Sequence, residues 1–227
     1  MTMITLATPE QFPLAALHVP SRRGPGRALV LIQEIFGINA AMRSAAQAWA
    51  ELGFEVLCPD LFGRQRAGVE LDPRVPEQFK AGVDLMQGMD PALALQDLVA
   101  ACNWFTRQQP GRPVAALGYC LGGRLAVQMA LQAPVSAVVS YYGVGLEALL
   151  PAEPARIAPT LLHIAENDAF STDAARAEVL ARAARLPGLV AHVYACCDHA
   201  FARPGGEHYD AAAAEAAQAR TLAFLGA

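Results

Sequence analysis

Three residues of the chain have the types and the order that nucleophilic catalysis requires. Cys120 lies in the segment GYCLGG (118–123), Asp168 in END (166–168) and His199 in CDHAF (197–201). A thiolate can attack a carbonyl carbon, an imidazole can move the proton, and a carboxylate can orient the imidazole. Nucleophile, acid and histidine follow one another in this order in triads that begin on a strand-to-helix turn. The three residues therefore predict hydrolysis of an ester-type bond through a covalent intermediate.

The segment around Cys120 has the pattern of a sharp turn between a strand and a helix. It follows the apolar run 114–117, and Gly118 and Gly122 supply the small neighbours that a strained turn needs. A helix that begins behind the thiol favours its thiolate form, and the Leu121 N–H would help to hold an oxyanion. The alternative is a buried cysteine packed between glycines, since free cysteine is among the most buried residue types.

Asp168 and His199 each follow an apolar run that is predicted to be a strand. Such positions lie at the edge where open α/β sheets hold their sites. Asp168 could instead cap a helix that starts near Ser171, and His199 could be an ordinary loop residue. Glu166 and Asp198 are neighbours that could take the place of Asp168. Because Asp168 and His199 both occur in the expected places and order, we prefer the triad.

The remaining histidines and cysteines predict structural roles. His163 and His192 lie inside apolar runs, and His208 lies at the start of a predicted helix. No grouping has the spacing of a zinc site, so we expect no metal and no cofactor. Packing roles are expected for the other four cysteines, Cys58, Cys102, Cys196 and Cys197. The last two adjoin each other close to the predicted base and could be sensitive to oxidation.

The elements that must position these residues follow from the hydrophobic pattern. Short apolar runs alternate with amphipathic stretches, which predicts an α/β fold with a mostly parallel sheet and helices on both faces. Strands are expected over 14–19, 28–33, 54–58, 113–119, 135–141, 159–165 and 189–195. Helices are expected over 40–52, 91–108, 121–133, 172–186 and 207–225.

The segment 59–90 departs from this alternation. It is rich in Pro, Gly and charge and contains no strong strand, so we expect a long loop that forms part of a pocket rim. No composition break marks a second domain, and residues 1–227 are expected to form a single domain. The opening residues Met1–Thr5 look like a vector-encoded leader, and we give them no structural role.

Composition narrows the class of partner. The net charge is −4, and the basic residues are sixteen Arg and one Lys, so no basic field is available to attract nucleic acid. The longest apolar runs have about five residues against the roughly 20 of a membrane helix. Five cysteines are an odd number for a disulfide framework, and the N-terminus lacks a secretion signal. We therefore expect a cytoplasmic protein, a monomer, that acts on a small molecule.

Five segments carry a resemblance to a known family: QEIFG (33–37), CPDL (58–61), GYCLGG (118–123), YYGVG (141–145) and HAFAR (199–203). The chain resembles the dienelactone hydrolases, or carboxymethylenebutenolidases, over nearly its whole length. The resemblance implies an α/β-hydrolase fold and the opening of an unsaturated lactone ring. It implies Cys120 as the nucleophile, His199 as the base and Asp168 as the partner that orients the base.

The resemblance also implies roles outside the triad. Glu34 would pair with the resting thiol and swing away when substrate binds. The Ile35 N–H would join that of Leu121 in the oxyanion hole, and Arg203 would hold the substrate carboxylate with a two-pronged hydrogen bond. Glu34 follows a buried apolar run, where an unpaired charge is costly, so a specific partner is expected there on physical grounds too.

The chain departs from the family pattern where a substrate carboxylate would bind. The resembling enzymes use a second Arg in the segment before the helix that precedes the nucleophile strand, and here that segment reads EQFKA (77–81). Either Lys80 or Arg74 compensates, although lysine cannot reproduce an arginine fork, or the substrate differs in size or charge. We also place Phe36 and Tyr141, from the motifs above, among the candidate substrate-binding residues.

Two further hypotheses remain open beside lactone hydrolysis. The same triad could serve a general esterase for short acyl groups, with Phe79 making the pocket more apolar. Alternatively, Cys120 could be a redox-sensing or thiol-binding residue on a scaffold that has lost catalysis. Comparing turnover of carboxylated and neutral substrates separates the first two, and a reversible sulfenic acid without an acyl-enzyme would indicate the third.

Overall fold

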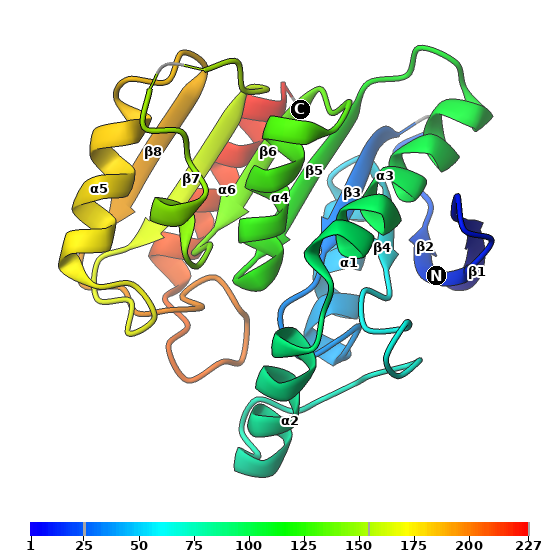
Figure 1. The fold of residues 1–227 in the computed structure, drawn as a ribbon, viewed down its shortest axis with the longest axis horizontal. Coiled ribbons are helices and arrows are strands. Elements are labelled where there is room, and N and C mark those ends of the chain that lie inside the picture. The colour runs from blue at the N-terminus through cyan, green and yellow to red at the C-terminus, as the bar shows by residue number, and fades with distance from the viewer. Residues whose placement is uncertain (25, 154, 227) are drawn as a thin grey trace. The chain divides into compact units, whose positions relative to one another are not determined.

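The computed structural model describes residues 1–24, 26–153 and 155–226, and the chain divides into two compact units, Met1–Ala115 and Ala116–Ala227. The strands are β1 (Thr2–Ala7), β2 (Pro13–Val19), β3 (Arg27–Ile32), β4 (Phe54–Pro59), β5 (Val114–Tyr119), β6 (Ala137–Tyr141), β7 (Thr160–Ala165) and β8 (Leu189–Tyr194). The helices are α1 (Ala40–Glu51), α2 (Pro76–Gln87), α3 (Pro91–Gln108), α4 (Leu121–Gln132), α5 (Asp173–Ala183) and α6 (Ala211–Leu225), with a short 3-10 helix η1 (Leu146–Ala148) (Figure 1).

The first unit is built on strands in the order β1-β2-β4-β3. β1 and β2 are antiparallel, β2 and β4 are antiparallel, and β3 and β4 are parallel. β3 is an almost continuous apolar run, as expected of a strand that is covered on both faces. The covering helices are α1 and α3, which lie on opposite faces of β4 in Figure 1.

The second unit holds the strands in the order β5-β6-β7-β8. β7 is parallel to both of its neighbours, β6 and β8. α4 packs against β6, and α6 contacts β7 from the opposite face (Figure 1). Because parallel strands point the same way, the residues that follow β6, β7 and β8 emerge at one edge of this unit.

These elements confirm the predicted fold class, a mostly parallel sheet with helices on both faces. Each of the seven predicted strands is present, and α3 has the predicted bounds. α6 begins at Ala211 rather than at 207, because the Asp210 carboxylate caps the helix by accepting from the Ala213 N–H at 2.9 Å.

Two expectations about local structure are wrong. The opening residues, which were given no structural role, form β1 and pair with β2 in the register Thr2 to His18. An edge strand needs chiefly backbone partners, and of its residues only Leu6 is buried, so the hydrophobic pattern carried little signal. The expected loop 59–90 contains the helix α2, which begins with Pro76 in its first turn and buries Gly82 alone.

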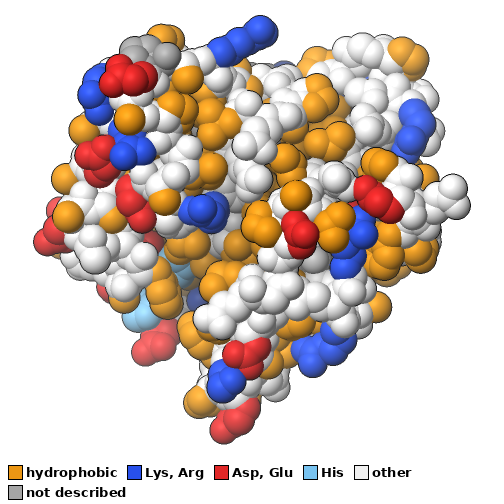
Figure 2. Space-filling view, viewed as in Figure 1, with side chains coloured by type: hydrophobic (Ala, Val, Ile, Leu, Met, Phe, Trp, Pro, Cys, Tyr) orange, Lys and Arg blue, Asp and Glu red, His pale blue; other side chains and the backbone are white. Residues whose placement is uncertain are grey.

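On the face drawn in Figure 2, basic and acidic side chains are interspersed with hydrophobic ones. Among the residues that the structure describes, no helix is both long and apolar enough to cross a membrane. All five cysteines are free thiols.

Candidate active site

Cys120 occupies a strained turn between β5 and α4. Its φ of 56° and ψ of −116° lie outside the usual regions for a residue with a side chain. The Cys120 N–H donates to the Tyr141 carbonyl oxygen at 3.0 Å, which fixes the turn to the end of β6. A Cβ at Gly118 would lie 2.0 Å from the Gly122 oxygen, so only glycine fits there. The turn places the thiol at the N-terminus of α4, beside the N–H of Leu121.

Asp168 and His199 are brought together by the loops after β7 and β8. The Asn167 N–H donates to the Cys197 carbonyl at 2.8 Å, and the Cys196 N–H donates to the Glu166 carboxylate at 2.8 Å. With the loops tied in this way, His199 Nδ1 lies 2.8 Å from Asp168 Oδ2. Since the Asp168 carboxylate accepts a hydrogen bond from the Nδ1–H, Nε2 is the ring nitrogen left to contact other groups.

The electrostatics of His199 are set by its two partners. Burial by itself would lower the pKa of this imidazole, because it disfavours the charged form. Hydrogen bonds to Asp168 and to Cys120, together with the charges of both groups, outweigh burial and raise the pKa of His199 to about 10. The imidazolium form of His199 is thus favoured at neutral pH.

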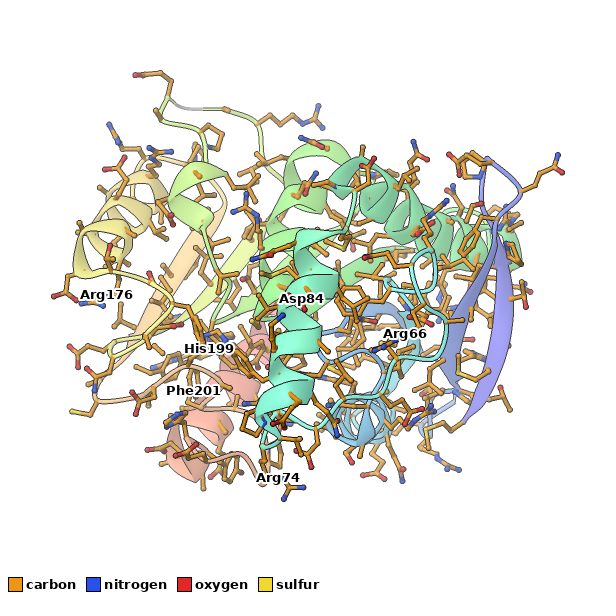
Figure 3. The ribbon with its side chains drawn as sticks, turned by 60° about the horizontal axis from the view of Figure 1, so that its bottom comes forward. Arg66, Arg74, Asp84, Arg176, His199 and Phe201 are labelled. Carbon is orange, nitrogen blue, oxygen red and sulfur yellow. The ribbon has the colours of Figure 1, made fainter. Side chains whose placement is uncertain are left out.

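Aromatic side chains surround the His199 imidazole. Tyr142 meets His199 edge to face with ring centroids 5.0 Å apart, and Phe170 does so at 4.7 Å. Phe201, which is fully buried, packs on Tyr142 and Tyr194 and anchors the segment after β8 that also carries His199 (Figure 3). The imidazole therefore sits in a mostly apolar wall, and Phe170 is its one exposed member, with 56% of its surface accessible.

Most of the non-glycine residues with a positive φ lie at the strand ends that carry Cys120 and His199. Five non-glycine residues have a positive φ among the residues that the structure describes: Gln11, Cys120, Tyr142, Cys196 and Ala200. Four of the five follow β5, β6 or β8 directly or within six residues. Such conformations cost of order 1–3 kcal/mol each and persist where the surrounding structure enforces them, as at functional sites.

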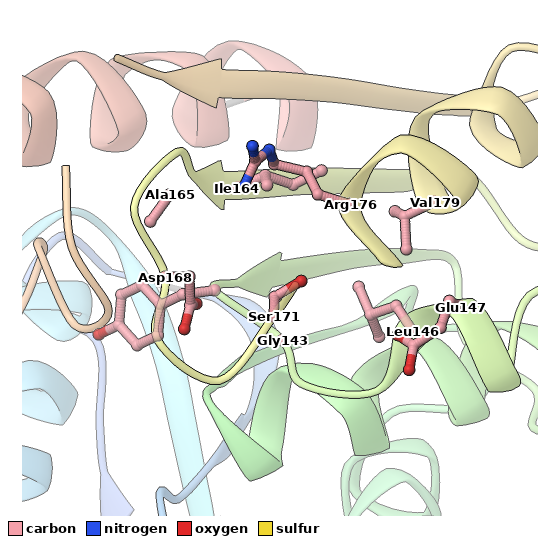
Figure 4. A pocket seen from close by; sticks show the side chains of 10 residues that line it. Gly143, Leu146, Glu147, Ile164, Ala165, Asp168, Ser171, Arg176 and Val179 are labelled. Carbon is pink, nitrogen blue, oxygen red and sulfur yellow. The ribbon is translucent and has the colours of Figure 1, made fainter. Parts of the chain in front are cut away.

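A small cavity lies beside Asp168. Its walls come from the loop after β6, the loop after β7 and α5, and include Tyr142, Ser171 and Arg176 (Figure 4). Arg176 is held by the Glu166 carbonyl at 2.6 Å and by Asp173 at 2.8 Å. The cavity is about 20 Å³, room for one or two water molecules next to the carboxylate rather than for a substrate.

In the first unit, the segment after β3 carries the other candidates. Glu34, Ile35 and Phe36 are all buried. α2 packs on this segment, since a Cβ at Gly82 would lie 2.5 Å from the Ile35 carbonyl oxygen and the ring of Phe79 lies 5.8 Å from that of Phe36. The segment after β3 and α2 thus pack together through Gly82 and an aromatic contact.

The cationic candidates have partners of their own. The Lys80 ammonium lies 2.7 Å from Asp84 on the same helix, and 75% of its side chain is exposed. Arg74 forms a fork with Asp72, is 77% exposed and extends away from the ribbon in Figure 3. To hold a substrate carboxylate, either residue would first have to leave its acid.

Arg203 belongs to the turn after His199. Its N–H donates to the Ala200 carbonyl at 2.9 Å, and its side chain is half-buried. The turn therefore fixes the backbone of Arg203 four residues beyond the predicted base.

The alternatives to Asp168 are occupied elsewhere. Glu166 accepts the Cys196 N–H, and Asp198 lies 3.7 Å from His208 at the surface. The cap of α5 is Thr172, whose hydroxyl accepts from the Ala175 N–H, so Asp168 is not needed as a helix cap. Of the three acids, Asp168 is the one that bonds His199.

Two side-chain predictions are wrong. Tyr141 was placed among the substrate-binding residues, but it is 2% exposed and its hydroxyl bonds that of Thr221 at 2.8 Å, so it belongs to the core. Cys196 was expected to pack inside, but it is exposed at a positive φ. His163 is buried and satisfied by Tyr194 and Thr221, as expected, and burial lowers its pKa to about 3.

Tyr142 and Phe170 were missed as neighbours of the predicted base, His199. Tyr142 adjoins Tyr141 in the YYGVG motif, and the sequence does not show which of the two rings turns toward the site. Phe170 follows Asp168 by two residues, and its position in a polar loop was the one available signal. Among the described residues, no cluster of three or more His, Cys, Asp or Glu is arranged to hold a metal ion.

Comparison with known proteins agrees with this architecture. A crystal structure from Klebsiella pneumoniae matches with a TM-score of 0.79 at 24% identity, covering 99% of this chain and 97% of that one. A relative from Azospirillum brasilense is 42% identical over 215 residues, which cover 91% of this chain and 89% of that one. The carboxymethylenebutenolidase of Pseudomonas putida is 38% identical over 205 residues, covering 89% and 86%.

The fold, with a strained turn at Cys120 after β5 and with His199 bonded to Asp168, is that of an α/β hydrolase. The family model for dienelactone hydrolases matches residues 14–227, and the chain therefore belongs to the dienelactone hydrolase family. This membership makes it a hydrolase of lactones or esters.

Proposed function

We propose that the chain hydrolyses a carboxylated enol lactone of the dienelactone kind through a triad of Cys120, His199 and Asp168. The observation that carries the proposal is the single chain of contacts from the Asp168 carboxylate through the His199 ring to the Cys120 thiol. The Pseudomonas putida relative, named a carboxymethylenebutenolidase, supports the substrate class.

The proposed first step is attack of the Cys120 thiolate on the lactone carbonyl carbon. The negative charge that develops on the carbonyl oxygen is stabilised by the Leu121 N–H at the start of α4. A second donor from the Ile35 N–H stays a prediction. Collapse of the tetrahedral intermediate breaks the ring C–O bond and leaves a thioester on the sulfur, while His199 protonates the departing oxygen.

The second step hydrolyses the thioester. His199, now neutral, removes a proton from water, and the resulting hydroxide attacks the thioester carbon. The C–S bond breaks, the acid leaves, and the proton on His199 restores the imidazolium–thiolate pair. Asp168 keeps the imidazole in one tautomer throughout. The pairing of Glu34 with the resting thiol stays a prediction, and its burial is the observation that motivates it.

Substitution of the nucleophile tests the proposal. Cys120→Ala should abolish lactone hydrolysis, with a fall in kcat/KM of at least about 10³-fold, while urea unfolding stays cooperative. Intact-mass measurement after mixing wild-type enzyme with a slow ester should detect an acyl adduct on Cys120. Undiminished turnover by the variant would overturn the assignment.

A general esterase on the same triad is the second candidate. Two observations favour it. Phe79 on α2 contacts Phe36, and the ammonium of Lys80 is paired with Asp84. The contact that α2 makes with the Ile35 segment is therefore mainly apolar. Comparing kcat/KM for a carboxylated lactone and for a neutral aryl ester separates the two. A redox thiol without catalysis would give a reversible sulfenic acid after peroxide and no acyl adduct.

We also propose that residues 1–227 act as one domain in the cytoplasm, as a monomer without a cofactor. The single family model covers parts of both units, which supports one domain. Five free thiols suit a reducing compartment. Gel filtration with light scattering would test the monomer.

A further inference from the structure

Phe170 stands out among the exposed apolar residues by its position. A single exposed hydrophobic side chain is ordinary, and Val190 and Val193 on β8 are further examples. Phe170 differs because its ring, 56% exposed, meets the ring of His199 at 4.7 Å with an interplanar angle of 76°. An exposed aromatic surface thus adjoins the imidazole that is proposed to move the proton.

The backbone holds this ring in place. The Phe170 N–H donates to Asp168 Oδ1 at 2.9 Å, while Oδ2 of the same carboxylate bonds His199. The Ser171 N–H donates to the Asp168 carbonyl at 3.0 Å and closes the turn. The ring is therefore tied to the acid and the base of the triad, and is preorganised rather than a free surface side chain.

The chemistry of the triad fixes what can approach this ring. Nδ1 of His199 is occupied by Asp168, so the departing oxygen of the substrate must be protonated from Nε2. The leaving group attached to that oxygen must therefore lie beside the imidazole of His199. Phe170 contacts the imidazole, and more than half of its own surface is exposed. Its ring can therefore contact the leaving group of the substrate and exclude water from that group.

We propose that Phe170 is a specificity-determining residue that binds the apolar leaving group of the substrate. In a lactone, the ring atoms next to the departing oxygen take the same place. The inference rests on the proposed function, because it uses the direction of proton transfer in the triad.

The test is a matrix of esters turned over by wild-type enzyme and by Phe170→Ala. One series keeps an acetyl group and lengthens the alcohol from methyl to butyl, benzyl and phenethyl, and a second keeps a methyl alcohol and lengthens the acyl group. Phe170→Ala should lower kcat/KM roughly tenfold for the benzyl and phenethyl esters and less than about twofold for methyl acetate, since removing apolar contact from a pocket gives differences of this size. In the acyl series, Phe170→Ala should change kcat/KM by the same factor for every ester.

Two further variants serve as controls. Phe170→Leu keeps apolar surface and should retain most of the preference for butyl over methyl. Val190→Ala removes exposed apolar surface from the opposite end of β8 and should leave the whole matrix unchanged.

The outcomes separate the two proposals. An equal loss on every ester would mean that Phe170 only positions His199, and it would overturn the specificity role. A preference that Phe170→Ala leaves intact would overturn it as well. Absence of turnover of a carboxylated enol lactone by wild-type enzyme, or lactone turnover that survives Cys120→Ala, would instead overturn the proposed function.

Discussion

The backbone N–H of Cys120 donates to the carbonyl oxygen of Tyr141, so Cys120 is positioned by a main-chain hydrogen bond between two strand ends. The thiol itself is not needed to hold the turn. Variants that change the Cys120 side chain are therefore expected to keep the fold, whereas changes in the backbone of the turn are not. A substitution at Gly118 tests the importance of the turn's backbone without changing the Cys120 side chain.

Gly118→Ala should unfold the turn or destabilise the protein by more than about 3 kcal/mol, because the new Cβ would lie 2.0 Å from the Gly122 oxygen. Urea unfolding measures the change. The matched variant is Gly205→Ala, where φ is +73° but no atom lies within 4 Å, so only the conformational cost of about 1–2 kcal/mol is expected. Equal losses in the two variants would contradict a steric role for Gly118.

Asp168→Asn should lower kcat by roughly 10³–10⁴-fold, because the amide cannot stabilise the imidazolium or hold its tautomer. The same change removes a hydrogen bond and a charge that raise the pKa of His199, so this pKa should fall in the variant. Two-dimensional NMR of the histidine side chains would follow the titration. Asp198→Asn, at the surface, is the control and should change neither quantity.

The raised pKa of His199 predicts a dependence of stability on pH. The folded protein binds the proton more tightly than the unfolded chain, whose histidines titrate near 6.5. This contribution is fully present below about pH 6.5 and is lost as the pH rises through about 10. Wild-type protein should therefore lose more stability than His199→Gln between pH 7 and 10, as followed by urea unfolding. Parallel curves for the two proteins would contradict the expectation.

Thr221→Val should cost about 1–3 kcal/mol, because it leaves two buried groups unsatisfied. The Thr221 hydroxyl lies 2.8 Å from that of Tyr141 and 2.9 Å from His163 Nε2. Thr106→Val is the control, since its hydroxyl bonds carbonyls of its own helix. The free energy of unfolding is measured in urea for both variants. If Thr221→Val loses no more stability than Thr106→Val, the hydrogen bonds of Thr221 to Tyr141 and His163 do not stabilise the fold.

Arg203→Ala should lower kcat/KM far more for a carboxylated lactone than for a neutral ester, since a guanidinium can hold a carboxylate with two hydrogen bonds. Lys80→Ala should have a smaller effect on this ratio, because the ammonium must first leave Asp84. Steady-state kinetics on both substrates gives the two ratios. Equal losses on lactone and ester in the Arg203 variant would count against a carboxylate site there.

The sequence predicted the strands well because most of them are buried on both faces and read as short apolar runs. Val138, Val139 and Leu162, for example, have no exposed surface. The order of Cys120, Asp168 and His199 along the chain then sufficed to place them at one edge, since each follows such a run. β1 and α2 escaped prediction because they bury one residue each, which leaves almost no periodic signal.

Side-chain direction was harder to predict than position. Tyr141 and Tyr142 are adjacent, and which of them faces His199 depends on the end of β6, where Tyr142 takes a φ of 39° while Tyr141 stays in the sheet. The ion pair of Lys80 also depends on local structure, since only a helix places Asp84, four residues further along the chain, beside it.

In the second unit, the loops after β6, β7 and β8 lie at one end of the parallel strands, so the connections at the other end can change in length. The connections 133–136 before β6 and 184–188 before β8 lie at the opposite ends of these parallel strands from the loop that carries His199. Insertions or a new pair of termini should be tolerated there, because each strand separates the connection that precedes it from the loop at its other end. The protein could thus gain a fused partner at either connection without losing the geometry on which its chemistry depends.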